Sequence, residues 1–298
     1  MTGAMKRLLL PLFAAFALTA CGTQQDTALP ADTEQAPALW AINGPDGAVE
    51  GWLFGTIHAL PDDFAWRTPM LDSTLKSADM LVVEVAALDD GAALSQLFED
   101  MAFDRPAGPI IDRIDPQYRD EFDALLVKAK VRRSYFDPME SWAAALALAQ
   151  VAQSAKSANG VDRALLTSFK GREVVELEGA KAQLAIFDSL PEKEQRDLLN
   201  AVLDETASYE DEIGELARTW QTGDTAKLGE LTKRGILADK ELKQVLLVQR
   251  NQAWAAQIEN LLSASQRPFV AVGAGHLLGP EGLPKLLEQR GYTVERVE

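Results

Sequence analysis

The chain of 298 residues contains two histidines, and both stand three residues after a glycine. His58 ends the stretch "GTIH" and His276 ends the stretch "GAGH", each after a run of apolar residues. Imidazole is a common metal ligand and the side chain that most readily carries protons near neutral pH. The shared spacing favours a shared metal site, where glycine, lacking a Cβ, lets the backbone approach a ligand closely. The alternative is that both are structural histidines whose bonding is satisfied in the core.

Carboxylates inside apolar segments supply the oxygen atoms that such a site needs. Glu84 lies within the apolar run 79–88, where an unpaired charge would be costly to bury. Glu176 and Glu178 lie two residues apart in 172–179, so in a strand both would face one side, with Glu178 nearer the carboxyl end. Two histidines and one glutamate leave room for a metal-bound water, and a second glutamate could accept its proton. These ligands suit Mn, Co, Zn or Fe, and the sequence does not choose among them.

Apolar strands separated by helices must position these side chains. We predict a hairpin around the turn at 43–47, further strands at 79–88, 172–179, 267–276 and 292–297, and helices at 70–78, across 91–169, within 192–263 and at 279–291. This alternation predicts an α/β sheet covered on both faces. Ligands of such sheets gather at the carboxyl ends of the strands, which is where we expect His58 and His276 to meet.

The first residues are typical of an export signal. Lys6 and Arg7 precede an apolar stretch that ends in small residues before Cys21, the single cysteine of the chain. This pattern resembles a lipoprotein signal, so we expect residues 1–20 to be removed and Cys21 to carry the lipid. An ordinary signal peptide with an incidental cysteine is the alternative. Residues 21–37 are small and polar and predict a flexible tether, followed by one domain over 38–298.

Charge and missing motifs exclude several classes of function. The chain carries 29 basic and 45 acidic residues, a net charge of −16, which becomes −18 once Lys6 and Arg7 are removed. Such a charge argues against nucleic-acid binding and against electrostatic docking on anionic lipid. Catalysis by cysteine is excluded, because Cys21 is assigned to the leader. The sequence also lacks the H-E-x-x-H, G-x-S-x-G, P-loop and C-x-x-C motifs.

Several blocks of the chain together resemble the TraB/GumN family in order and spacing. The blocks are "GTIHALP", "VVEV", "GVDRALL", "ELEGAKAQLAIFDSLP", "QRNQAW" and "AVGAGHLLGPEGLPKLLEQRGYTVERV". The family includes pheromone-shutdown and polysaccharide-cluster proteins and is related to the Tiki metalloproteases of animals. The resemblance implies the fold of the erythromycin-esterase and ChaN-like class, a central mixed sheet flanked by helices with a large helical insertion.

The resemblance also implies roles for particular residues. Tiki proteins are described as divalent-metal-dependent proteases with both G-x-x-H histidines and a glutamate at the active centre. Carried over, His58, Glu84 and His276 become the metal ligands, with Glu84 also a candidate base and Glu178 a further member of the site.

Two residues of the long helical tract match the family's Arg-Asn pair, namely Arg250 and Asn251. Arg250 could stabilise a substrate carboxylate or a developing oxyanion. It could equally form a structural ion pair with a buried strand glutamate, and the sequence leaves both roles open.

The resulting expectation is a lipid-anchored, divalent-metal-dependent hydrolase that acts on a peptide or protein outside the cytoplasm and faces the periplasm. The outer membrane is preferred over the inner one, because Gly22 rather than aspartate follows Cys21. The alternative is a non-catalytic lipoprotein that binds a metal, haem or a peptide. A hydrolase requires His58, His276 and a carboxylate to converge, whereas a haem site requires an apolar slot around the histidines.

Overall fold

The computed structural model describes residues 36–58, 60–61, 64–88, 90–152 and 159–298. The expected signal segment, Cys21 and residues 21–35 of the expected tether lie outside the described residues. Within the described part of the chain, no helix is both long and apolar enough to cross a membrane.

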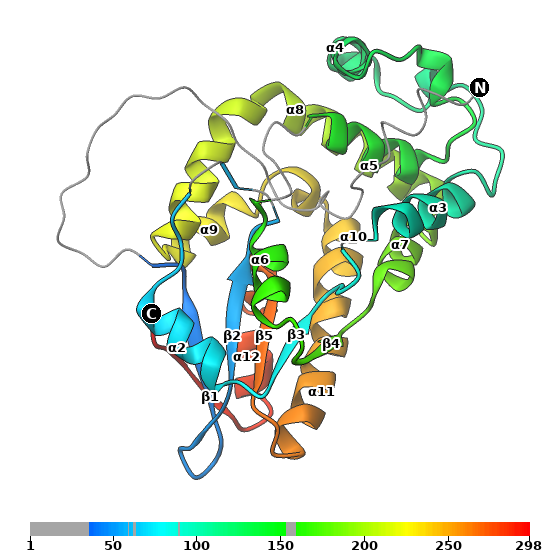
Figure 1. The fold of residues 1–298 in the computed structure, drawn as a ribbon. Coiled ribbons are helices and arrows are strands. Elements are labelled where there is room, and N and C mark those ends of the chain that lie inside the picture. The colour runs from blue at the N-terminus through cyan, green and yellow to red at the C-terminus, as the bar shows by residue number, and fades with distance from the viewer. Residues whose placement is uncertain (1–35, 59, 62–63, 89, 153–158) are drawn as a thin grey trace.

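Six strands of the described residues form one mixed sheet in the order β4-β3-β5-β2-β1-β6 (Figure 1). Their bounds are β1 Leu39–Asn43, β2 Val49–Thr56, β3 Met80–Val83, β4 Glu173–Glu176, β5 Pro268–Gly273 and β6 Thr293–Arg296. Strands β4, β3, β5 and β2 are parallel, while β1 runs antiparallel to both β2 and β6. The predicted hairpin around 43–47 is confirmed as β1–β2, and the carboxyl ends of four parallel strands meet at one edge.

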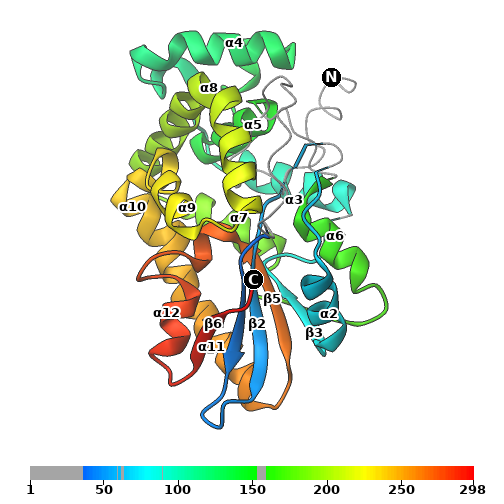
Figure 2. The same cartoon turned by 90° about the vertical axis from the view of Figure 1, so that its left-hand side faces the viewer.

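Helices cover both faces of the sheet, as Figure 2 shows. Helices α2 (Pro69–Ser77) and α6 (Val161–Ser168) lie on one face, and α11 (Gln249–Ser263) and α12 (Leu283–Glu288) lie on the other. The two faces are packed into separate cores, one built on Phe54 and Phe269 and the other on Leu53 and Val270. Strands β3 and β5 are apolar on both faces because both faces are covered, which is why their sequences read as continuous apolar runs.

A helical insertion forms a third core beyond the carboxyl edge of the sheet (Figure 1). It contains α3 (Gly91–Ala102), α4 (Arg119–Ala129), α5 (Ser141–Ala152), α7 (Ala180–Asp188), α8 (Glu192–Gln221) and α10 (Lys240–Lys243). The alanine-rich α5 is buried over most of its length and packs against α8, as its apolar sequence predicts. The tract 192–263 breaks at Gly223 and Gly235, both with positive φ, between α8, α9 (Thr225–Leu231) and α10.

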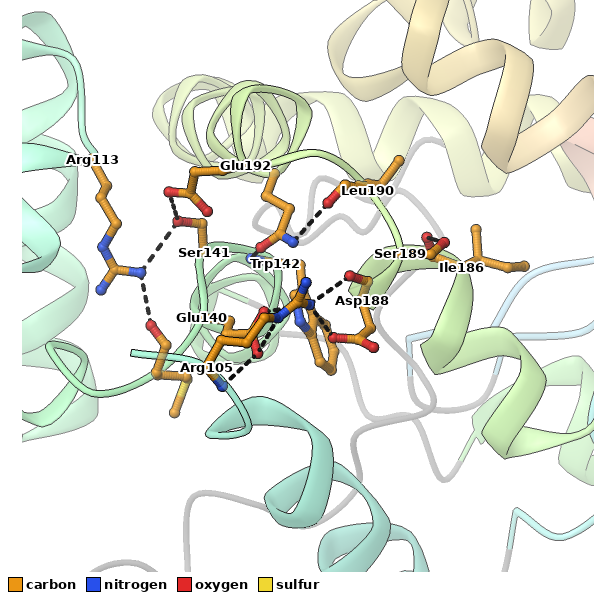
Figure 3. A network of polar contacts seen from close by, with 12 residues as sticks. Arg105, Arg113, Glu140, Ser141, Trp142, Ile186, Asp188, Ser189, Leu190 and Glu192 are labelled. Carbon is orange, nitrogen blue, oxygen red and sulfur yellow. Dashed lines mark hydrogen bonds and ion pairs between the residues drawn. The ribbon is translucent and has the colours of Figure 1, made fainter. Parts of the chain in front are cut away.

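Polar contacts tie the helices of this insertion together (Figure 3). Arg105 reaches two carboxylates, with its Nη2 2.7 Å from Glu140 Oε2 and 2.5 Å from Asp188 Oδ1. Buried Arg113 donates to the Ser141 hydroxyl and to several backbone carbonyls. These contacts lie in the insertion, and they connect α5 with the segments before and after it.

Three predicted strands are shorter in the structure than the sequence pattern indicates. The predicted strand 79–88 ends at Val83, the strand 172–179 ends at Glu176, and the strand 267–276 ends at Gly273. Glu84 was expected inside a strand, and it instead follows one. Of the residues that directly follow these three strands, Glu84 is polar, and it bonds to Arg250 and Gln183, whereas Leu177 and Ala274 are apolar.

Candidate functional site

The four parallel strands each deliver one polar side chain to the same edge of the sheet. His58 follows β2, Glu84 follows β3, Glu178 follows β4 and His276 follows β5, each one to three residues past the strand end. Backbone bonds fix these ends to one another, since the amides of Glu178 and Gly179 both donate to the carbonyl of Glu84. These four residues therefore follow strand ends at the carboxyl edge, where ligands of parallel sheets gather.

His276 is held as a neutral imidazole with a known tautomer. Asn251 donates from Nδ2 to the carbonyls of His276 and Glu281, so its Oδ1 faces His276 Nδ1 at 2.6 Å. An amide oxygen only accepts, so Nδ1 carries the hydrogen and Nε2 carries the lone pair. Burial and the positive charge of Arg250 lower the pKa of His276 from 6.5 to about 3. His276 thus presents an uncharged nitrogen lone pair at neutral pH.

His58 is held through the same ring nitrogen but by a carboxylate. Its Nδ1 lies 2.5 Å from Oδ2 of Asp162, near the start of α6. The amide of Val161 donates to the carbonyl of Ile57, which fixes that helix beside the end of β2. Burial alone lowers the pKa of His58, but the charge and hydrogen bond of Asp162 outweigh it and raise the pKa to about 9. Asp162 occupies Nδ1, so Nε2 is the nitrogen left for a proton or a ligand.

Glu84 is ionised, and both of its carboxylate oxygens accept hydrogen bonds. Its Oε1 accepts from the amide of Gly273 at 2.8 Å, and its Oε2 accepts from Gln183 at 3.1 Å and from Arg250 at 2.8 Å. Burial alone would raise the pKa of Glu84, but Arg250, the two histidines and the Gly273 amide lower it to about 2. Glu84 is therefore an anion at any pH at which the protein is expected to work.

Arg250 lies at the centre of the cluster. It forms a two-point ion pair with Glu178, from Nε at 2.9 Å and from Nη2 at 3.0 Å, in addition to its bond to Glu84. Its Nη1 donates to the carbonyl of Leu246 at 2.9 Å and lies 3.3 Å from Nε2 of His276. The side chain is 11% exposed. Of the two roles that the sequence left open for Arg250, the structure shows the ion pair with buried glutamates.

A stretch of π-helix sets the direction of these helix residues. Gln244–Val248 adopts π geometry directly before α11. A π turn contains an extra residue, and it shifts the side chains that follow relative to an uninterrupted helix. Arg250, Asn251 and Trp254 come next, and all three contact His276, with the Trp254 ring centroid 4.4 Å from that of the imidazole. The π turn therefore directly precedes the part of α11 whose side chains contact His276.

The first glycine of each G-x-x-H motif lies where a side chain would meet a close neighbour. A Cβ on Gly55 would lie 3.1 Å from both Cα and Cβ of Ala274, inside the second motif. A Cβ on Gly273 would lie 3.3 Å from Oε1 of Glu84 and 3.7 Å from Cδ2 of His276. Strands β2 and β5 are neighbours, so the second motif occupies the space that a side chain at Gly55 would need. The absence of a side chain at Gly273 instead leaves room for Glu84 and for His276 of the same motif.

Adding one methyl group at Gly55 is expected to destabilise the protein. Gly55→Ala should lower the free energy of unfolding by about 1–3 kcal/mol, because backbone atoms of Ala274 cannot move away as a flexible side chain could. Gly229→Ala is the matched control, since no atom lies within 4 Å of its Cβ position in α9 and alanine favours a helix. Urea denaturation of both variants measures the difference, and equal stability of the two would contradict the packing argument.

The structure adds two residues that the sequence did not single out as site residues, Asp162 and Gln183. Asp162 lies in the first turn of a helix, where an acidic residue is common for reasons of helix charge, so nothing local marked it. Glu176 was expected to share a face with Glu178, but its Oε1 accepts from the amide of Ala86 instead. Glu176 thus fixes the segment after Glu84 and does not join the cluster.

The cluster contains the types of side chain that bind a divalent metal ion, although these side chains do not surround one common point. Among the described residues, no group of three or more His, Cys, Asp or Glu side chains is arranged to hold a metal ion. Each histidine is nevertheless fixed at Nδ1 by an oxygen atom, as metal-ligating histidines usually are, and an ionised glutamate lies beside them. The donor set of His58, His276 and Glu84 therefore fits, with Arg250 bonded between Glu84 and His276.

The family model that matches the chain covers residues 38–296 and is described as the TraB/PrgY/gumN family. The chain belongs to this family. The Escherichia coli and Shigella flexneri proteins named "Uncharacterized protein YbaP" are each 29% identical over 245 residues, covering 79% of this chain and 86% of theirs. An uncharacterized protein of Treponema pallidum is 23% identical over 293 residues, covering 92% of this chain and 87% of its own. No solved structure matches the chain significantly.

Membership of this family does not by itself identify a reaction. The matched relatives carry no described activity in their names. The expected family resemblance is confirmed, and so is the α/β fold with a helical insertion.

Proposed function

We propose that this protein is a divalent-metal-dependent hydrolase that cleaves peptide bonds at the carboxyl edge of its sheet. The observation that carries the proposal is the paired fixing of both histidines at Nδ1, by Asp162 and by Asn251. Nε2 is then the remaining ring nitrogen of each imidazole, and His58 would have to give up its proton there to an ion, at the edge where Glu84 also lies. Active sites hold catalytic histidines in this way because orientation and tautomer must be set before the reaction begins.

In this proposal His58, His276 and Glu84 hold the ion, while Asp162 and Asn251 orient the two imidazoles. A divalent ion supplies polarisation of the substrate carbonyl and a lowered pKa of bound water. The low pKa of Glu84 favours the role of ligand over that of base, since a base with a pKa of about 2 accepts a proton poorly at neutral pH.

We also propose that the protein acts outside the cytoplasm, anchored to a membrane through a lipid on Cys21 and facing the periplasm. The sequence of residues 1–21 supports this placement. The polar segment 22–35 would hold the domain away from the bilayer, where it could meet a soluble or membrane-bound polypeptide; residues 36–37 of the expected tether are buried in the domain.

The test is hydrolysis of a fluorogenic peptide library by the full chain in detergent, after chelation and reloading with Mn²⁺, Co²⁺, Zn²⁺ or Fe²⁺. Cleavage should require one of these ions and should fall about 10- to 100-fold in Asp162→Asn, as for other outer partners of metal-bound histidines. Asp79→Asn is the matched control, because Asp79 also pairs with a cation, Arg267, before β3 at the opposite end of the strand.

Two results would contradict the proposal. Cleavage that persists unchanged after chelation would remove the metal from the mechanism. Metal binding without cleavage of any library member would favour the non-catalytic alternative, a lipoprotein that binds a metal or a peptide.

A further inference from the structure

We infer that Arg250 is a resident counter-cation that a divalent ion must displace from Glu84 and His276, so that ion binding and the present position of Arg250 exclude each other. This inference rests on the metal ion of the proposed function. It adds that Arg250 supplies the positive charge beside Glu84 and Glu178 when no ion is bound.

The hydrogen-bonding capacity of Arg250 is fully used in the present arrangement. A guanidinium group has five N–H bonds. Five contacts are observed: two with Glu178, one with Glu84, one with the carbonyl of Leu246 and one with Nε2 of His276. The guanidinium also lies over the Trp254 ring at 4.6 Å. Arg250 is thus a built part of the cluster, and it has no spare donor for a substrate while it stays there.

Two of the atoms that Arg250 contacts are the atoms that a metal ion needs. His276 offers only Nε2, because Nδ1 donates to Asn251, and this Nε2 faces Arg250 Nη1 at 3.3 Å. Each oxygen of Glu84 has one neutral donor, the Gly273 amide at Oε1 and Gln183 at Oε2, and Arg250 Nη2 takes a second position on Oε2 at 2.8 Å. A cation bound to both atoms would lie where the guanidinium lies. Two cations cannot share a buried position at contact distance, since their repulsion is weakly screened there.

The contacts of Arg250 divide into two that must be released and three that can stay. The exchange removes the bonds to Glu84 and His276. The two-point pair with Glu178 and the bond to the carbonyl of Leu246 do not involve a metal-ligating atom. Glu178 is therefore the positioning residue that would keep Arg250 at the site after the ion has entered. Because these three contacts engage Nε, Nη1 and Nη2, the guanidinium can leave Glu84 and His276 only if its retained partners move with it.

The experiment is a calorimetric titration of the full chain, purified in detergent without a histidine tag, with Mn²⁺ and with Zn²⁺. Arg250→Met removes the competing charge and should bind the ion at least tenfold more tightly than the unmodified chain. Arg250→Lys keeps a cation and should bind close to the unmodified chain. Arg105→Met is the matched control, because Arg105 also bridges two carboxylates, Glu140 and Asp188, but in the helical insertion. It should leave the affinity unchanged.

Each outcome decides between the exchange and its alternatives. Equal affinity of the unmodified chain and Arg250→Met would overturn the exchange while leaving the metal-dependent function standing. Failure of both to bind any ion would overturn the exchange and the metal of the proposed function together. Tighter binding in Arg105→Met as well would show a general effect of freed carboxylates and would also overturn it.

A second variant covers the case in which Arg250→Met does not fold. Arg250→Met/Glu178→Gln removes one positive and one negative charge, so the cluster keeps its overall charge while Glu84 and His276 are freed. It should also bind Mn²⁺ at least tenfold more tightly than the unmodified chain. Affinity at or below that of the unmodified chain would count against the exchange.

Discussion

Replacing Arg250 by methionine is expected to lower the free energy of unfolding by about 3–5 kcal/mol at pH 7 in the absence of metal ions. The variant leaves Glu84 and Glu178 without their shared cation, and both are about one-tenth exposed. Breaking a buried ion pair at one partner costs this much because the remaining charges keep the penalty of burial without the attraction. Urea denaturation followed by circular dichroism measures the loss.

The loss of stability in Arg250→Met should be smaller at low pH, and it should be larger than the loss caused by removing an exposed arginine. Below about pH 5 the deficit of Arg250→Met should shrink, because burial raises the pKa of Glu84 once Arg250 no longer opposes it, so Glu84 can take up a proton. Arg133→Met is the matched control, since Arg133 pairs with Asp123 on the surface and both side chains are about half exposed. Its cost should stay within about 1 kcal/mol. A cost for Arg250→Met as small as that of the control would contradict the placement of Arg250 at the centre of a buried cluster.

The two histidines are expected to titrate at opposite ends of the pH scale. His58 should keep its proton up to a pKa of about 9, because Asp162 outweighs the effect of burial, and His276 should stay neutral down to a pKa of about 3, because burial and Arg250 oppose its charge. The chain has only these two histidines, so imidazole ¹⁵N resonances assign both without ambiguity. Asp162→Asn should move the pKa of His58 downward and leave that of His276 near its original value.

These pKa values set the pH dependence of stability in the metal-free protein. His58 binds its proton more tightly in the folded state, so its contribution is complete below pH 6.5 and is lost as the pH rises toward 9. His276 and Glu84 have lowered pKa values, so their contributions are complete above pH 6.5 and 4.5 and are lost as the pH falls toward 3 and 2. Stability should therefore peak near pH 6.5. A maximum near pH 9 or above would contradict the assignment of His58.

The sequence predicted the gathering of the main residues but not their partners. His58 and His276 could be placed because each ends an apolar strand, and parallel strands share one edge. Glu84 could be placed because a carboxylate in an apolar run needs a partner. Asp162 and Gln183 could not, because they depend on how α6 and α7 pack beside strands far away in the sequence.

In the fold, likewise, local sequence patterns predicted some elements but not the ends of the strands. The hairpin β1–β2 and the helix α2 follow local patterns of apolar residues, and the predicted turn at 43–47 and helix at 70–78 lie close to the observed elements. The strand ends were predicted too late, because an apolar run continues past the last residue that pairs with its neighbour. The sequence also left open whether Glu178 accepts a proton or pairs with a cation. That choice depends on the position of Arg250, which only the three-dimensional structure gives.

The most direct test of the metal site is the metal content of the full chain, measured by elemental mass spectrometry after purification without chelator and without a histidine tag. We expect close to one Mn, Co, Zn or Fe per chain after loading and dialysis, and loss of that ion in a His58→Ala/His276→Ala double variant. Folded protein that retains none of the four ions after loading, or a double variant that retains as much as the unmodified chain, would contradict it.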